Sequence, residues 1–101
     1  MTASVAGEPA GRARKRDKPR IFHDILASII EQERERDGAA RITRIQDEVN
    51  LPSDRLRIHV REMSDLGLIQ YGKTLTSTEK GRRFMAEYQK IVNTLQQFGL
   101  L

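Results

Sequence analysis

The last quarter of the chain carries a spacing that few small folds can accommodate. Five apolar residues follow one another there at steps of four, three, four and three: Phe84, Tyr88, Ile91, Leu95 and Phe98. This alternation is the seam of a heptad repeat on a helix. A helix over 77–97 is roughly 31 Å long, which is more than a domain of this size can cover. The spacing therefore predicts a long terminal helix that packs only partly on its own domain.

The part of the seam that the domain leaves uncovered predicts a second chain. With 101 residues, the protein has a thin core that buries only about 60 to 65% of its unfolded surface. Met85 and Val92 widen the seam, so the helix can face its own domain and a partner at once. We expect a homodimer in which two such helices pair antiparallel about a two-fold axis. The alternative is that the whole seam packs within the chain against the first helix.

Three further helices are predicted upstream. Over 20–36, six apolar residues recur at three- and four-residue steps: Ile21, Phe22, Ile25, Leu26, Ile29 and Ile30. Shorter helices follow over 44–49 and 54–65, with Thr43 and Ser53 as expected N-caps. Asn50 ends the first of them, and Pro52 biases Leu51 away from helix. Two short helices joined by so tight a turn predict a helix-turn-helix.

After Gly67 the apolar period changes from helical to two. Leu68–Tyr71 and Thr74–Thr76 flank Gly72 and predict two short strands around a turn. Thr76 stands three residues before Glu79, which is the spacing of a capping box that opens the last helix at 77. The predicted fold is mostly α with a small β wing: a winged helix-turn-helix over 20–76 and a dimerisation helix over 77–101.

Residues 1–19 contain almost no large apolar side chain and predict a disordered basic arm. Residues 1–20 hold six basic groups against two acidic ones, whereas the other 81 residues hold twelve of each. The net charge of +4 therefore arises within residues 1–20, that is, from the arm and Arg20. We expect Arg14, Lys15 and Arg16 to touch phosphates or a minor groove. A solubilising tail is the alternative.

The helix predicted over 54–65 carries Arg55, Arg57 and Arg61 away from its apolar face. Guanidinium groups on an exposed helix suit a major groove, where they bond guanine edges or phosphates. The alternative is a solvated face, on which neighbouring Asp54, Glu62 and Asp65 pair with these arginines.

Three more side chains are candidates for phosphate contact. Ser53 at the helix start can cap the helix, bind a phosphate, or do both. Arg44 and Lys73, at the start of the second helix and the wing tip, lie where phosphates would flank the groove. Either is equally well explained as an idle surface charge.

Other classes of function find no support in the sequence. The chain has no cysteine, and His23 and His59 lack partners at ligand spacing, so we expect no metal site and no cofactor. His59 is expected to be a partly buried core residue. No phosphate loop or activated nucleophile argues for an enzyme or for a small-molecule ligand. No apolar run is long enough for a membrane span. We expect a cytoplasmic, nucleoid-associated protein.

Several phrases of the sequence resemble a known family. They are IFHDILASI at 21–29, Asn50-Leu51, DLGLI at 65–69 and LTSTEKGRRFMAEY at 75–88. Together they span about two thirds of the chain and resemble the small archaeal winged-helix regulators and chromatin proteins of the 10a type. The resemblance implies a dimer through antiparallel C-terminal helices, with the third helix and the wing on DNA. The chain departs from the family in a charged insertion at 31–39 and in His59, where an aromatic is usual.

These observations lead to one hypothesis and one competitor. The leading hypothesis is a dimeric transcriptional regulator or chromatin-associated protein that binds double-stranded DNA. The competitor is a winged-helix protein-interaction module without DNA binding, favoured by the zero net charge outside the arm. An RNA-binding function ranks third, because the 54–65 helix offers no exposed aromatic side chain for base stacking.

Overall fold

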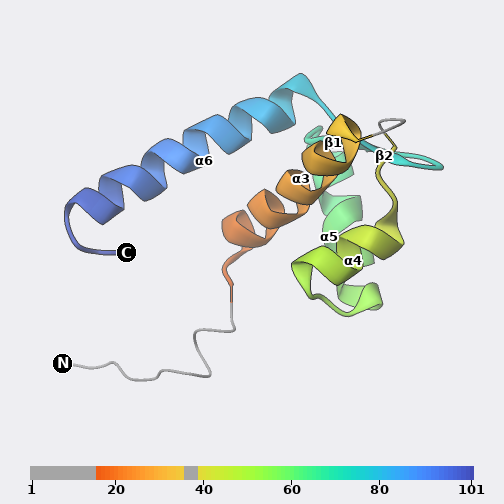
Figure 1. The fold of residues 1–101 in the computed structure, drawn as a ribbon, viewed down its shortest axis with the longest axis horizontal. Helices are drawn as coiled ribbons and strands as arrows, with labels where there is room; N and C mark the ends of the chain where they lie inside the picture. The colour runs from red at the N-terminus through yellow and green to blue at the C-terminus, as the bar shows by residue number, and fades with distance from the viewer. Residues whose placement is uncertain (1–15, 36–38) are drawn as a thin grey trace.

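A computed structural model describes residues 16–35 and 39–101, and six elements follow one another in them (Figure 1). They are α3 (Lys18–Arg34), α4 (Ile42–Val49), α5 (Ser53–Asp65), β1 (Ile69–Tyr71), β2 (Leu75–Ser77) and α6 (Glu79–Gln97). The predicted fold class is confirmed, because the described chain is mostly helical with one two-stranded antiparallel sheet.

The first helix begins two residues earlier than predicted. Asp17 precedes α3, and its Oδ1 accepts a hydrogen bond from the backbone N–H of Arg20 at 2.9 Å. Pro19 fits the first turn because its missing N–H is not needed there. Residues 16–19, assigned to the arm from the sequence, thus belong to the folded domain. The disorder predicted for 1–15 lies outside the described residues.

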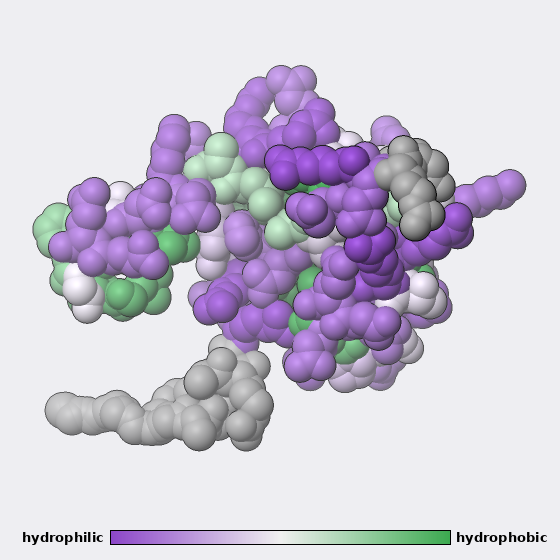
Figure 2. Space-filling view, viewed as in Figure 1, coloured by the Kyte–Doolittle hydropathy of each residue, from purple (hydrophilic) through white to green (hydrophobic). Residues whose placement is uncertain are grey.

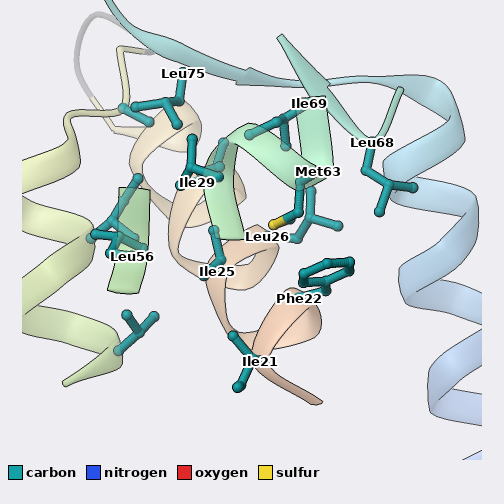
Figure 3. Packing of buried hydrophobic residues seen from close by; sticks show 14 residues of the cluster. Ile21, Phe22, Ile25, Leu26, Ile29, Leu56, Met63, Leu68, Ile69 and Leu75 are labelled. Carbon is teal, nitrogen blue, oxygen red and sulfur yellow. The ribbon is translucent and has the colours of Figure 1, made fainter. Parts of the chain in front are cut away.

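The core forms where α3 meets α5 and the two strands. Figure 3 shows their side chains converging on one cluster. Ile25, Leu26 and Ile29 of α3 are fully buried, as are Leu56 and Met63 of α5. Burying one such side chain contributes about 1.5 to 3 kcal/mol. The apolar stripe predicted from the sequence therefore fixes how α3 lies in the domain.

The predicted caps of α4 and α5 are wrong. α4 begins at Ile42, before Thr43, because Gln32 of α3 accepts the backbone N–H of Arg41 at 2.9 Å and holds the helix start. α5 begins at Ser53 itself, since the first helical bond, from Leu56 N–H, ends on the carbonyl of Pro52 at 2.9 Å. In neither case does the side chain of the capping residue make the hydrogen bond.

The turn between α4 and α5 is as predicted. Asn50 ends α4 in the left-handed region, with φ of 58°.

A polar network joins α3 to α4. The buried Gln32 donates to Ser28 Oγ at 3.1 Å, and Ser28 donates to Glu48 of α4. Because these buried polar groups are paired, they hold α4 against α3 at little desolvation cost.

The wing is a hairpin with a third short pairing. Gln70 lies opposite Thr76, and Ala40 forms a bridge to Leu75 on the other side of β2. Ala40, just before α4, is thus paired with the wing. Glu33 of α3 accepts both the N–H and the Oγ of Ser77, at 2.9 and 2.7 Å. The wing is therefore fastened to the first helix.

α6 opens at Thr78, and the predicted capping box from Thr76 is wrong. Thr76 lies in β2 and is paired with Gln70 of β1, so its backbone belongs to the sheet. Thr78 Oγ1 accepts the N–H of Gly81 at 3.0 Å and donates to the carbonyl of Gly67 at 2.6 Å. Lys80 Nζ donates to the carbonyl of Leu66 at 2.7 Å. The Thr78–Gly81 segment thus joins the start of α6 to the end of α5.

We expect Thr78→Val to lower the free energy of unfolding by about 1 to 2 kcal/mol, the usual cost of losing an N-cap. The substitution keeps the size and shape of the side chain and leaves the N–H of Gly81 and the carbonyl of Gly67 without this partner. Thr78→Ser retains the hydroxyl and should stay within about 0.5 kcal/mol of the parent. Urea unfolding followed by circular dichroism measures both, and equal stability of the two variants would contradict the assigned role of the hydroxyl.

Candidate nucleic-acid interface and dimer surface

The exposed face of α5 carries basic side chains that the domain does not use. Arg55, Arg57 and Arg61 are exposed. Among residues 16–35 and 39–101 no ion pair or side-chain hydrogen bond engages them. Two of their three acidic neighbours are engaged by other groups: Glu62 binds Lys18 Nζ at 2.7 Å, and Asp54 accepts the backbone N–H of Arg55 at 3.0 Å. Lys18 lowers the pKa of Glu62. The ion pairs of the alternative reading are therefore not formed in the described chain, although the arginines are exposed to solvent.

The opposite face of α5 is anchored in the core. Leu56, Val60 and Met63 are fully buried. His59 is partly buried, as predicted, and its ring meets Phe22 edge-on at 6.1 Å. Because one face is fixed so firmly, the direction in which the arginines project is also fixed.

The start of α5 and the tip of the wing present further polar groups. Ser53 is exposed and stands at the first helical position, and the cap residue Pro52 offers no side-chain hydrogen bond. The side chain of Asp54 bonds the backbone N–H of Arg55 there, and the other free N–H groups of the first turn are the kind of donors that bind an anion. Lys73 is exposed in the turn between β1 and β2. Lys73 lies at the wing tip as predicted, whereas Ser53 lies within α5 and is not its cap.

Two predicted contact residues have partners within the protein. Arg44 binds Glu35 through both terminal nitrogens, at 2.6 and 2.8 Å, and Glu48 through Nε at 3.0 Å. These hydrogen bonds raise its pKa further above the ordinary value. Arg16 donates to Asp24 at 2.9 Å and to the carbonyl of Val49 at 2.8 Å. Contact with a phosphate would compete with these bonds. Arg14 and Lys15 lie outside the described residues.

The predicted seam on α6 divides into two parts. Phe84 packs against the core cluster, and the ring of Tyr88 lies 4.9 Å from that of His23 on α3. Burial raises the pKa of Tyr88, and the nearby charge of Asp17 adds to the effect. Ile91, by contrast, is 58% exposed. The first part of the seam is therefore intramolecular, and the second part is uncovered.

The second half of α6 and the start of α3 enclose a groove. Figure 1 shows the two helices diverging, and the groove between them has a volume of about 690 Å³. Tyr88, Ile91, Val92 and Leu95 line its α6 side. Figure 2 shows hydrophobic atoms gathered at the end of α6, where Phe98, Leu100 and Leu101 are exposed.

α6 ends in a hydrogen-bonded C-terminal cap. Leu100 N–H donates to the carbonyl of Leu95 at 2.9 Å, and Gly99 N–H donates to that of Gln96 at 3.0 Å. With Gly99 at φ of 74°, this is a Schellman motif, which glycine favours. The helix ends at Gln97 as predicted. Phe98 follows it as the cap residue, 73% exposed.

Sequence reasoning missed two exposed residues. Ile58 lies near the middle of the outward face of α5, although its position off the apolar stripe was visible in the sequence. Arg41 is exposed beside Ala40, which pairs with the wing. The position of Arg41 depends on that long-range pairing of Ala40, so the residues near Arg41 in the sequence do not predict it.

Within the described residues, no group of three or more His, Asp, Glu or Cys side chains is arranged to hold a metal ion. None of the helices in that part of the chain combines the length and apolarity that crossing a membrane requires.

Comparison with known proteins places the chain in a family. A family model described as winged helix-turn-helix matches residues 15–96. The curated proteins contain no match to the chain. The matched range holds α3, α4, the arginine-bearing α5, both strands of the wing and all of α6 but its last residue. The chain therefore belongs to the winged helix-turn-helix family.

Proposed function

We propose that this protein binds double-stranded DNA as a homodimer and acts as a transcriptional regulator or chromatin component. α5 enters the major groove, while the wing and the N-terminal arm contact the backbone or a minor groove. The observation that carries the proposal is the set of arginines on α5 that form no ion pair in the described chain, while Glu62 and Asp54 beside them are engaged by other groups. On DNA the protein is nucleoid-associated in the cytoplasm.

The geometry of α5 supports this use. Successive residues on a helix are separated by about 100°. Arg57 and Arg61 therefore lie together on one flank of the exposed face, and Arg55 lies on the other flank. A helix about 10 to 12 Å across fits a major groove about 12 Å wide. Arginines on both flanks can reach the phosphates that line the groove or the guanine edges within it.

The dimer rests on the uncovered half of the α6 seam. Ile91 is exposed and Leu95 partly so, and both line the apolar groove beside α3. We propose that the α6 helix of a second copy covers this surface in the antiparallel sense. Phe84 and Tyr88 then hold α6 in position for this pairing, because their rings already pack on their own domain.

The experiment is a titration of the full chain on duplex DNA between about 50 and 200 mM salt. Each phosphate contact contributes about −0.9 to the slope of log K against log salt. Arg57→Gln and Arg61→Gln should each weaken binding by about 1 to 3 kcal/mol if the side chain bonds a base edge, and then at one base position only. A phosphate contact instead weakens binding to all sequences alike. Lys90→Gln is the matched control, because Lys90 is an exposed cation on α6.

The location of the contacts is tested by removing residues 1–15. The cut stops before Arg16, because Arg16 and Asp17 hold the start of α3. A salt slope that survives the deletion assigns phosphate contacts to the folded domain. Absence of binding at low salt in the full chain would overturn the proposal and favour the competing protein-interaction module.

A further inference from the structure

Ile58 is placed where the fold gains nothing from it. Its side chain is 64% exposed in the middle of α5. Of the other large hydrophobic residues exposed in the described chain, Leu66 ends α5, and Ile91, Phe98, Leu100 and Leu101 belong to the end of α6. A β-branched residue is also a slightly unfavourable choice for an exposed helix position. Neither packing nor helix propensity explains an isoleucine here.

The helix neighbours of Ile58 carry charges of both signs. Arg55 and Arg61 stand three residues away and have no ion pair in the described chain, whereas Asp54 and Glu62 stand four residues away and are bonded to the backbone N–H of Arg55 and to Lys18. The opposite face of α5 is centred on Leu56, Val60 and Met63, which are fully buried. Helical geometry therefore puts Ile58 close to the centre of the outward face, between the arginines.

A single aliphatic side chain set among charged side chains, two of them arginines without an ion pair in the described chain, fits DNA better than it fits a protein. The centre of a protein interface is large, apolar and depleted of charge. In the major groove, guanine offers two acceptors to arginine, and thymine offers a methyl group to an apolar side chain.

We propose that Ile58 contacts the 5-methyl group of a thymine, and that the preferred DNA site places this thymine between positions read by Arg55 and Arg61. The inference rests on the proposed DNA binding. Residues three apart rise about 4.5 Å along a helix, and base pairs are about 3.4 Å apart. The thymine therefore lies about one base step from each arginine contact.

The test compares thymine with deoxyuridine, which pairs identically and lacks only the methyl group. Preferred duplexes are first selected from a random pool with the full chain, and each thymine is then replaced singly. At one position the parent protein should bind the deoxyuridine duplex about fourfold more weakly than the thymine duplex. This is the factor expected when the burial of one methyl group is lost. Ile58→Ala should bind both duplexes equally and with the affinity that the parent has for deoxyuridine.

The control variant is Leu66→Ala, which removes another exposed apolar side chain of this region and should keep the fourfold discrimination. Thermal unfolding should be unchanged in Ile58→Ala because the side chain is exposed. A parent protein that selects no sequence, or that binds thymine and deoxyuridine alike at every position, overturns the inference. So does discrimination that persists in Ile58→Ala. Loss of self-association in Ile58→Ala, measured by sedimentation, would assign the residue to a contact between chains instead.

These outcomes are separate from those of the proposed function. A protein that binds duplex DNA with a clear salt slope and ignores the methyl group refutes the role of Ile58 and leaves DNA binding standing. A protein that binds no duplex refutes both.

Discussion

Gly81→Ala is expected to lower the free energy of unfolding by about 3 kcal/mol, at the upper end of the usual cost of overpacking a core. A Cβ at this position would lie 2.1 Å from the carbonyl oxygen of Leu68 and 3.2 Å from Cδ2 of Leu26. The first contact is with backbone that leads into β1, so relief requires α6 and the wing to move apart. In an open helix the same change would instead stabilise the protein, because alanine is the better helix former.

Gly72→Ala is the matched control. An added Cβ there meets nothing nearer than the carbonyl oxygen of Thr74 at 4.0 Å. We expect its unfolding free energy to stay within about 0.5 kcal/mol of the parent. Urea unfolding of the two variants separates a steric cause from a general effect of replacing glycine. A Gly81→Ala protein as stable as the parent would show that α6 is free to shift at its start, contrary to the close packing described above.

Ile91→Asp is expected to convert the proposed dimer to a monomer. In a two-fold arrangement the substitution acts twice, and each copy loses an isoleucine burial of about 1.5 to 3 kcal/mol. It also places a carboxylate in an apolar interface, which adds a desolvation cost. Because Ile91 is 58% exposed in the single chain, the folded domain itself should keep its helix content. Sedimentation equilibrium over a range of protein concentrations measures the change in association.

Asn93→Asp provides the comparison, since it adds the same charge on the opposite side of α6, at an exposed position. It should leave the dimer intact. Equal dissociation of both variants would point to charge repulsion along α6 rather than to the seam. A parent protein that is monomeric at all concentrations would overturn the proposed pairing. The DNA affinity of the Ile91→Asp monomer should also fall, because a dimer holds two α5 helices on one duplex.

The sequence by itself determined the elements and their order. The apolar period, Asn50 at the end of a helix and Pro52 after it are local signals, because they depend on residues within one or two turns of each other. The helix-turn-helix, the wing and the long last helix follow from them. The exposure of Ile58 was also implicit in the pattern, since it stands off the stripe of Leu56, Val60 and Met63.

The tertiary structure alone decided which polar groups are free and where the helices begin. Gln32 starts α4 from another helix, and Thr78 caps α6 because Thr76 is paired in the sheet. Arg44 and Arg16 meet partners on neighbouring elements, whereas Arg57 and Arg61 meet none in the described chain. Local propensities differ too little to settle such choices. Partners distant in sequence decide where the helices begin and which polar groups are paired. This long-range pairing distinguishes the basic residues that stabilise the fold from those that are available to bind.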